Sequence, residues 1–551
     1  MQKVLTAEQM REVDRLTTER YGIPSILLME NAAHAVARVI TEKLGGSVKG
    51  KSVLILCGKG NNGGDGAALA RILGLDGAFV DVVLFGKIKE TKGDARINFG
   101  VLCSEDFTYD DVYQSSFCEL REVTSKDQWN AIQMPLFNSA DVIVDAIFGT
   151  GLTRPLEIWV YNVVHELNFL GEDPSPKPRL RISVDIPTGL NADTGAELNI
   201  AVQAELTVTL TAPKAGNVLP GAASFNGDLV IADIGSPQDL IDEQSSQLFL
   251  AERSDASAWL ENAAFSSGDY KNKRGHTLVI AGSEDYSGAA VLAGNAAIRS
   301  GVGLVTVVTP RSSKDSVASR VLPEVMVRGV AETESGSISE TAFGKLKDLF
   351  ENADSVTIGC GLSQDESTKK FVEKVIVNCS MPVIVDADAL NLLSPFAGSL
   401  QKPARSKGID GPPLILTPHE GEFMRLLGID DKDAIKDRVE AVRDFAVKNG
   451  VILVLKGERV LMGAPDGRVV VNPTGNSGLG KAGNGDTLAG ILAGFVAQAV
   501  KFKIDIFETV VAAVYVAGMA GDIAEKRYGT RVMTASDVRE CLTEAFAELA
   551  V

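Results

Sequence analysis

Short apolar runs that end in glycine, asparagine or an acid recur along this chain. The first occupies residues 51–58 (KSVLILCG) and is followed by a glycine-rich segment and then by an apolar helical pattern at 67–73. An apolar run of this length, bounded by turn residues, is typical of a buried strand. Strand, glycine loop and helix in this order predict the first βα unit of a nucleotide-binding sheet.

The same pattern continues to near the C-terminus. Thr6 and Gln9 form a predicted capping box ahead of an amphipathic helix at 7–20, and a second helix is expected from Ser25. Further strands are predicted at 79–85, 140–145, 181–185, 206–210, 228–232, 277–281, 304–309, 355–358, 382–385, 414–416 and 451–455, with helices ending near 300 and spanning 487–500. Strands that alternate with helices predict α/β architecture with largely parallel sheets flanked by helices.

A chain of 551 residues is too long for one core, so at least two domains are expected. A polar stretch opens at Gly235 and runs to about residue 257, which places the boundary near 240 and predicts domains at 1–240 and 241–551. Residues 103–130 are expected to be an irregular excursion, and 401–413 a surface loop.

Composition narrows the class of protein. The net charge of −18 argues against general binding to nucleic acid or to an anionic membrane. The polar N-terminus is unlike a signal peptide, and the absence of an eighteen-residue apolar run predicts no membrane span. Six scattered cysteines and only four histidines favour free thiols in a reducing cytoplasm and no zinc site. The sequence leaves a homo-oligomer open.

The strongest local signal is the segment 472–486, which holds five glycines in fifteen residues and leads into an apolar helix. Glycine lets backbone N–H groups approach an anion, and a helix N-terminus adds partial positive charge. The segment is either a phosphate cradle, in which Asp486 takes a proton from an attacking hydroxyl, or a glycine-rich turn that ends a strand.

Polar residues follow several other predicted strands, at the edge where parallel sheets bind ligands. Asp145 and Asp185 are expected to point towards the 61–65 loop; the alternative is that each caps a helix. Asp185 has no basic neighbour in sequence after Arg181 and is therefore a candidate base. Asn62, Asp145 and the Thr188 turn offer only oxygen ligands, which suit a hard cation.

The second half offers its own candidates, each with a simpler alternative. Asp386 and Asp388 either hold magnesium through water or cap a helix. His419 either hydrogen-bonds a substrate or caps the next helix. Lys456 either binds a phosphate or is merely solvated. Their shared position at strand ends predicts one crevice for a nucleotide and an acceptor.

Taken together, these motifs resemble two enzyme families. The first half resembles the NAD(P)H-hydrate epimerases through TAEQM at 6–10, MENA at 29–32, GNNGGDG at 60–66, VDAIFGTG at 144–151 and VDIPTG at 184–189. The second half resembles the ADP-dependent NAD(P)H-hydrate dehydratases of ribokinase-like fold through YSGAA at 286–290, DADAL at 386–390, LTPHEGEF at 416–423 and the 472–486 segment. The resemblance covers nearly the whole chain.

The resemblance implies repair of hydrated nicotinamide cofactors. The first domain would interconvert the R and S hydrates of NADH and NADPH. The second would dehydrate the S form to NAD(P)H, using ADP and releasing AMP and phosphate. The residues alone also allow an ADP- or ATP-dependent small-molecule kinase whose first half is a non-catalytic ligand-binding module. That alternative leaves the 61–65 loop, Asp145 and Asp185 without a role.

The resemblance also implies roles for particular residues. Asp185 and Asp486 would be catalytic. The hydrate would contact Asp185 and, in the epimerase, Asn61, Asn62, Gly63, Gly64, Asp65, Gly149, Thr150, Gly151, Leu152, Thr153, Arg154 and Pro155. In the dehydratase it would contact Ala289, Gly361, His419 and Asp486. The nucleotide would contact Lys456, Gly457, Glu458, Arg459, Val460 and Gly485. Potassium would bind Asn62, Asp145 and Thr188, and magnesium would serve the dehydratase.

Overall fold

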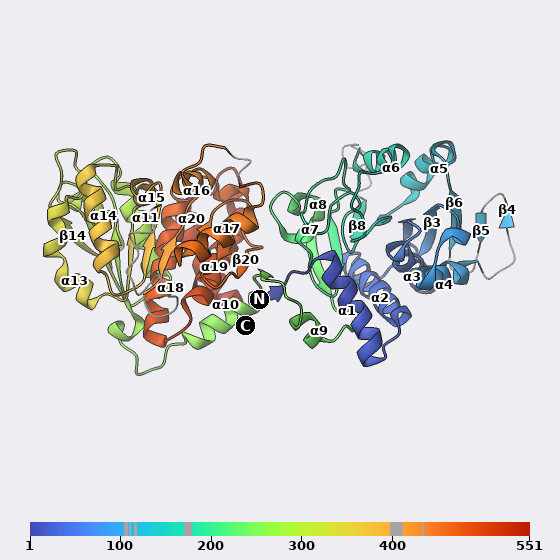
Figure 1. Cartoon of the computed structure of the whole chain (residues 1–551), viewed down its shortest axis with the longest axis horizontal. Coiled ribbons are helices and arrows are strands. Elements are labelled where there is room, and N and C mark those ends of the chain that lie inside the picture. Colours follow the sequence, from blue (N-terminus) through green and yellow to red (C-terminus); the bar gives the residue numbers. More distant parts are fainter. Residues whose placement is uncertain are drawn as a thin grey trace. The chain divides into compact units, whose positions relative to one another are not determined.

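In the computed structural model, the chain folds into two α/β units, Gln2–Ser246 and Gln247–Val551, each with a central sheet (Figure 1). It describes residues 1–103, 118–169, 179–396, 412–431 and 435–550, and the backbone of 108–109 and 112–114. The first unit ends later than residue 240 because Leu240 and Ile241 are buried in a cluster with Met10 and Val13. The surface loop predicted at 401–413 lies outside the described residues except for its last two.

The first unit holds a nine-stranded sheet in the order β10-β9-β8-β7-β2-β3-β6-β5-β4. Its strands are β2 (Ser52–Cys57), β3 (Phe79–Phe85), β4 (Thr108–Tyr109), β5 (Val112–Gln114), β6 (Glu119–Val123), β7 (Val142–Ala146), β8 (Leu180–Val184), β9 (Leu206–Leu210) and β10 (Asp228–Ala232). The short strand β1 (Gln2–Lys3) is not part of this sheet. From β10 to β6 neighbouring strands are parallel, and β6, β5 and β4 pair antiparallel.

Helices cover both faces of this sheet (Figure 1). They are α1 (Ala7–Tyr21), α2 (Ser25–Lys43), α3 (Asn61–Leu75), α4 (Gly93–Leu102), α5 (Lys126–Ser139), α6 (Ile158–Phe169), α7 (Ala215–Val218), α8 (Ala223–Asn226) and α9 (Gln238–Asp242). Alternate residues of β2 point to opposite faces: Val53 and Ile55 pack in the cluster of α2, α3 and α4, whereas Leu54 and Leu56 pack with α5 and α6.

Two expectations for this unit were wrong in detail. The predicted helix at 67–73 begins six residues earlier, so the glycine loop forms the first turns of α3. The irregular excursion at 103–130 contains β6 and the start of α5. Ser125 caps α5 by accepting a hydrogen bond from the Gln128 N–H, a signal that the sequence carried.

The second unit holds a sheet in the order β11-β20-β19-β18-β17-β16-β15-β12-β13-β14. These strands are β11 (Leu248–Leu250), β12 (His276–Ile280), β13 (Leu304–Pro310), β14 (Met326–Val330), β15 (Ser355–Ile358), β16 (Val383–Val385), β17 (Leu414–Leu416), β18 (Ile452–Leu455), β19 (Leu461–Gly463) and β20 (Val469–Val471). The sheet is largely parallel, as predicted, and β19 is antiparallel to both of its neighbours.

The helices of the second unit are α10 (Arg253–Asn262), α11 (Ser287–Arg299), α12 (Lys314–Ala318), α13 (Lys347–Asn352), α14 (Glu366–Asn378), α15 (Ala387–Leu392), α16 (Glu420–Leu427), α17 (Arg438–Asn449), α18 (Asn484–Phe502), α19 (Ile506–Tyr528) and α20 (Ala535–Leu549). By length and composition α19 passes as a membrane-spanning helix, but 72% of its most apolar window is buried inside the protein. It packs with α10, α18 and α20 in one apolar cluster, which is the environment of a core helix.

Each sheet has a switch point, where the strands that come later in the chain are added on the opposite side of the first central strand. In the first unit this point lies between β2 and β7, and in the second between β12 and β15. Loops that leave two such strands diverge to opposite faces of the sheet and open a crevice at their carboxyl ends. The residues with predicted functions follow these strands and their neighbours.

Candidate functional site

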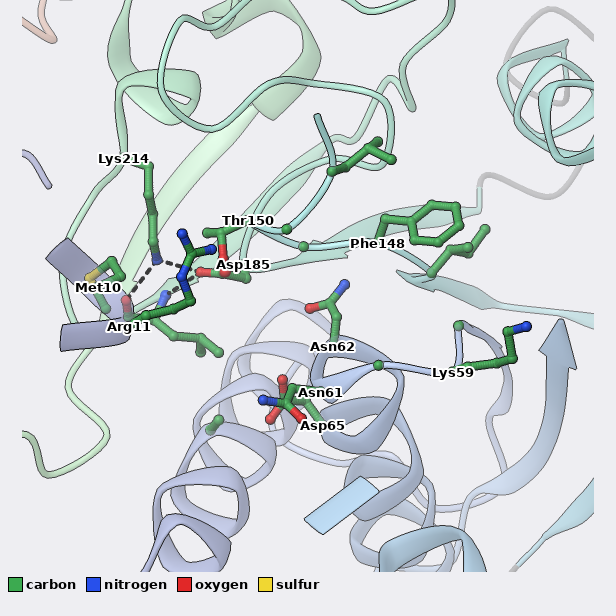
Figure 2. A pocket seen from close by; sticks show the side chains of 18 of the residues that line it. Met10, Arg11, Lys59, Asn61, Asn62, Asp65, Phe148, Thr150, Asp185 and Lys214 are labelled. Carbon is green, nitrogen blue, oxygen red and sulfur yellow. Dashed lines mark hydrogen bonds and ion pairs between the residues drawn. The ribbon is translucent and has the colours of Figure 1, made fainter. Parts of the chain in front are cut away.

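A cavity of about 710 Å³ lies at the carboxyl end of the first sheet (Figure 2). Its lining includes most of the residues that the resemblance assigns to the hydrate: Asn61, Asn62, Asp65, Gly149, Thr150, Gly151, Leu152, Thr153, Arg154, Pro155 and Asp185. The loops after β2, β7 and β8 supply them, so strands that are distant in sequence converge on one cavity.

Gly63 and Gly64, by contrast, do not line the cavity. A Cβ on Gly63 would lie 1.8 Å from the Gly58 carbonyl oxygen, and one on Gly64 would lie 2.8 Å from the Ala95 Cα. These glycines let the start of α3 pack against the end of β2 and against α4. This packing accounts for the two glycines, and their contact with substrate stays a prediction.

The start of α3 opens into this cavity. Gly60 is its N-cap residue and provides no side-chain cap, and Gly60 and Asn61 both line the cavity. The first N–H groups of a helix lack intrahelical partners and carry partial positive charge. This helix end is therefore suited to an anionic group such as a phosphate.

Asp145 is fully buried and faces Thr188 instead of the cavity. Its Oδ1 accepts a hydrogen bond from the Thr188 hydroxyl at 2.7 Å, and its Oδ2 accepts from the Thr188 N–H at 2.8 Å and from the Ser183 hydroxyl at 2.9 Å. Burial raises the pKa of Asp145, while the hydrogen bonds from Thr188 and Ser183 lower it. The orientation of Asp145 towards the 61–65 loop stays a prediction, and Thr188 and Ser183 are its partners in the structure.

Asn62 is also buried, and neither its amide oxygen nor its amide nitrogen has a hydrogen-bond partner among the described residues. A Cβ on Gly149 would lie 3.4 Å from the Asn62 Oδ1, so the amide sits against the turn that follows β7. Buried amides are almost always hydrogen-bonded, and an orphan of this kind requires an explanation. One explanation is a cation held by Asn62 together with Asp145 and Thr188.

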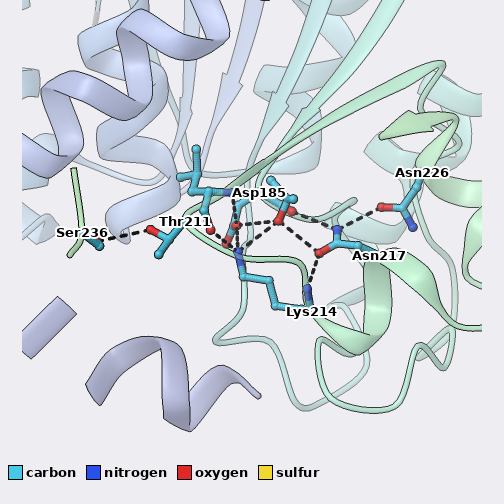
Figure 3. Close-up of polar contacts among 8 residues, drawn as sticks. Asp185, Thr211, Lys214, Asn217, Asn226 and Ser236 are labelled. Atoms are coloured by element: carbon cyan, nitrogen blue, oxygen red, sulfur yellow. Dashed lines mark hydrogen bonds and ion pairs between the residues drawn. The ribbon is translucent and has the colours of Figure 1, made fainter. Parts of the chain in front are cut away.

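Asp185 follows β8 and lies in the cavity wall, and it does have a basic partner. Lys214, from the turn after β9, donates to Asp185 Oδ1 and is only 1% exposed (Figures 2 and 3). Asp185 has no basic neighbour in sequence after Arg181, and the fold supplies one from 29 positions further along the chain. Because β8 and β9 are adjacent parallel strands, a lysine just after β9 lies near an acid just after β8, and this signal was available.

In the second unit, the 472–486 segment is held by residues of α19 and the turn after it. Asp522 accepts hydrogen bonds from the Gly475 N–H and from the Asn476 side chain, both at 3.0 Å. Lys481 donates to the Met533 carbonyl at 2.9 Å. Gly483, with φ of 90°, is the N-cap residue of α18, and a Cβ there would lie 2.6 Å from Leu292 Cδ1. These contacts therefore fix the conformation of the segment at the N-terminus of α18.

Asp486 lies in the first turn of α18, next to a buried thiol and a buried ion pair. Burial, followed by the nearby Asp386, raises the pKa of Asp486 to about 6, against lowering by a hydrogen bond with Cys360. Burial also raises the pKa of the Cys360 thiol, and Asp486 and Asp386 raise it further. A carboxyl with a pKa close to neutral is suited to proton transfer.

Lys456 is paired with Asp386, and 20% of its side chain remains exposed. Their Nζ and Oδ1 atoms lie 2.7 Å apart, and the Glu422 carboxylate is 3.9 Å from the same Nζ. Burial lowers the pKa of Lys456, but Asp386 and Glu422 outweigh burial and raise it. A Cβ on Gly485 would lie 3.6 Å from Nζ, so the lysine reaches the start of α18. The remainder of the predicted nucleotide segment, Gly457–Val460, follows directly, and Arg459 donates to the Pro473 carbonyl.

Asp388 and His419 both have structural partners. Asp388 accepts from the Ser363 N–H at 2.9 Å, which fixes the turn after β15. His419 caps α16: its Nδ1 accepts from the Glu422 N–H at 3.2 Å. The capping alternative for His419 is confirmed, and its ring remains half-exposed.

Ala289 and Gly361 are brought together, as their shared assignment required. Gly361 has φ of 64°, and a Cβ on it would lie 3.0 Å from the Ala289 Cβ and 2.8 Å from the Tyr286 Cβ. The turns after β12 and β15 thus meet at the switch point of the second sheet. Sequence reasoning missed Lys214, which contacts Asp185, Asp14, which lines the first cavity, and Asp522, which holds the 472–486 segment.

The fold and the two sites are typical of a two-domain α/β enzyme that binds its ligands at the carboxyl ends of parallel strands. Two family models match it: YjeF-related protein N-terminus over residues 25–216 and NAD(P)H-hydrate dehydratase over residues 277–544. The bifunctional NAD(P)H-hydrate repair enzyme Nnr of Moorella thermoacetica is 36% identical over 98% of this chain and 96% of its own length. Nnr of Thermofilum pendens is 33% identical over 99% and 97%.

The chain belongs to the family of bifunctional NAD(P)H-hydrate repair enzymes. Among solved structures, an ADP/ATP-dependent NAD(P)H-hydrate dehydratase from Bacillus subtilis, co-crystallized with ATP/Mg2+, is 30% identical. It covers 55% of this chain and 98% of its own, with a TM-score of 0.47. The similarity to the repair enzymes extends over both units, which disfavours a kinase joined to a non-catalytic module.

Proposed function

We propose that the first unit interconverts the R and S hydrates of NADH and NADPH, and that the second dehydrates the S form with ADP. Membership of the repair-enzyme family supports the pairing of these two activities in one chain. The observation that carries the proposal is Asp486: a carboxyl with a pKa of about 6 at the N-terminus of α18, where a phosphoryl group would be stabilised.

In the second unit, Asp486 accepts the proton of the ring hydroxyl as that oxygen attacks the terminal phosphoryl group of ADP, and AMP leaves. The phosphate is then expelled with a proton from the adjacent ring carbon, and the double bond of NAD(P)H is restored. Backbone N–H groups at the start of α18 offset charge on the transferring group. The Lys456–Asp386 pair places a cation beside Gly485, where the nucleotide phosphates would lie.

Magnesium would bind together with the nucleotide phosphates rather than at a site formed by protein side chains alone. Asp386 is engaged with Lys456 and Asp388 with the Ser363 N–H, and the described residues contain no group of three or more metal-ligating His, Cys, Asp or Glu side chains. Magnesium is commonly held by one or two carboxylates together with substrate phosphates.

In the first unit, Asp185 is the acid/base group and the start of α3 binds phosphate. A potassium ion would be held by Asn62, Asp145 and Thr188. The orphan amide of Asn62 and the oxygen-only donor set fit a hard cation. The ion would fix the turn after β7 against α3 and offset the buried charge of Asp145.

The division of labour is tested with one substitution in each unit, using mixed NADH hydrates and ADP. Asp486→Asn should stop recovery of NADH but leave R–S interconversion intact. Asp185→Asn should leave dehydration of the S form intact and slow interconversion to its spontaneous rate. Loss of both activities from either variant would contradict the assignment.

A further inference from the structure

The two oxygens of Asp185 have different environments. Oδ1 accepts from Lys214 Nζ, from the Leu210 N–H at 3.2 Å and from the Thr209 hydroxyl at 3.4 Å (Figure 3). Oδ2 has no hydrogen bond to any residue in the described part of the chain. Asp185 also has φ of 67°, a left-handed conformation that a non-glycine residue keeps only where its surroundings hold it. The network therefore fixes one oxygen and leaves the other for a ligand in the cavity.

Lys214 is fully used within this network. Its ammonium group donates to Asp185 Oδ1, to the Thr209 hydroxyl at 3.0 Å and to the Leu210 carbonyl at 2.8 Å. An ammonium group has three protons, so these three acceptors satisfy it. Asn217 braces the same corner, donating to the Asp185 carbonyl at 3.1 Å and accepting from the Lys214 N–H at 2.9 Å. Lys214 thus directs its ammonium group to one oxygen of Asp185 and has no proton left for another acid.

A second carboxyl lines the same cavity without such a partner. Asp14 lies on α1, and its Oδ1 is buried with no hydrogen-bond partner among the described residues. A buried, unpaired carboxyl favours its neutral form, because charge is costly away from water. Burial raises the pKa of Asp14 to about 6, against lowering by Lys214 and with a further rise from Asp185.

We propose that Asp14 is the proton donor that works opposite Asp185 in epimerisation, and that Lys214 is the positioning residue that divides the two carboxyls into an acid and a base. The inference rests on the proposed role of Asp185. Two carboxyls whose environments favour opposite charge states are the arrangement expected for paired acid and base chemistry.

The chemistry balances with these two groups alone. Water added beside the ring nitrogen leaves one carbon that bears both the hydroxyl and the nitrogen, and the epimers differ there. Asp185 takes the hydroxyl proton, the carbon–oxygen bond becomes a carbonyl, the carbon–nitrogen bond breaks, and the nitrogen takes the proton of Asp14. Rotation of the freed carbonyl and reversal of the same step close the ring on its other face and return both protons.

The charged and titratable groups around Asp14 set the sign of the pH dependence. Lys214 and Asp185 act on it from the turns after β9 and β8, Asp65 from α3, and Arg11 lines the same cavity from α1. Burial raises the pKa of Asp65 well above its usual range, and Asp185 and Asp14 raise it further. A donor must carry its proton, so the epimerisation rate should fall as pH rises above about 6.

The test measures R–S interconversion by chromatography in the full-length enzyme without ADP, from pH 5 to 8, after subtraction of the spontaneous rate. Asp14→Asn should lower kcat at pH 6 by about 100-fold or more, with a small change in KM, and should abolish the decline above pH 6. Asp14→Glu should retain part of the activity. Glu12→Gln, an acid-to-amide change on the same helix at a residue paired with Arg15, should match the wild type.

Two outcomes overturn the inference. One is an Asp14→Asn enzyme within about threefold of the wild type that keeps the same pH profile. The other is a wild-type rate that does not fall above pH 6. An unchanged KM for Asp14→Asn and unchanged intrinsic tryptophan fluorescence establish that its loss of rate is not misfolding. If Asp185→Asn itself interconverts the hydrates normally, the proposed role of Asp185 fails, and this result is distinct from a failure at Asp14 alone.

Discussion

Replacing Lys214 by methionine tests how much the buried ion pair contributes to the first unit. The lysine side chain is 1% exposed and that of Asp185 is 13% exposed, so the substitution leaves a nearly buried carboxylate without its counter-charge. Removing one partner of a buried pair typically costs about 3–5 kcal/mol. The two remaining donors, the Leu210 N–H and the Thr209 hydroxyl, offset part of this loss. We therefore expect the free energy of unfolding to fall by about 3 kcal/mol.

The assay needs a signal from the first unit alone, and the tryptophans provide one. The chain has three tryptophans, of which Trp129 and Trp159 lie in the first unit and Trp259 in the second. In a Trp259→Phe background, fluorescence during urea unfolding reports the first unit only. Lys43→Met is the control, because its pair with Asp228 is similarly close, at 2.8 Å, but exposed, and should be worth less than about 1 kcal/mol.

The result also depends on the charge that is left behind. If the cost arises from an unpaired carboxylate, the double variant Lys214→Met/Asp185→Asn should be more stable than Lys214→Met alone. A fall of less than about 1 kcal/mol for Lys214→Met would refute the reasoning. So would a double variant that is no more stable than the single one.

Three further predictions concern other parts of the molecule. Dehydration by the wild type should decline as pH falls below about 6, because Asp486 must be unprotonated to accept a proton and its pKa is raised to about 6; a pH profile of kcat/KM that is flat from 5 to 8 would contradict this. Gly66→Ala should cost about 1–3 kcal/mol in urea unfolding, because its Cβ would lie 2.8 Å from Cys57 Sγ, whereas Gly100→Ala in α4, with nothing within 4 Å, should not destabilise. Thr188→Val should raise the potassium concentration needed for half-maximal epimerisation at least tenfold at constant ionic strength, with dehydration as the internal control; an unchanged potassium response would remove Thr188 from the cation site.

The sequence was sufficient for most of the central parallel strands because these strands are buried on both faces and end in turn residues, whereas β6, β11, β14 and β19 were not predicted. The runs at 79–85, 206–210 and 355–358 coincide with β3, β9 and β15. Thr6 and Gln9 formed the predicted capping box. Strand β20 was missed because three apolar residues give no period to measure, and the end of the first unit because Leu240 and Ile241 are only two apolar residues in a polar stretch.

The sequence predicted the site residues that directly follow one strand, but not the contacts that depend on which strands are neighbours. Asp486, Asn62 and Asp185 lie where motifs and strand ends placed them. The pairs Lys214–Asp185 and Lys456–Asp386 join residues 29 and 70 positions apart, so they depend on which strands are neighbours. Asp14 has no local signal, because an acid on an amphipathic helix normally faces solvent. Its burial arises only when α1 packs against the cavity.

The most direct test of the central claim is recovery of NADH from mixed R and S hydrates by the full-length enzyme with ADP. The reduced-ring absorbance should rise to the level of both epimers together, faster than spontaneous epimerisation allows, with one AMP and one phosphate formed per NADH. Recovery that stops at the S fraction and then proceeds only at the spontaneous rate would contradict an epimerase in the first unit. An absence of recovery would contradict the account as a whole.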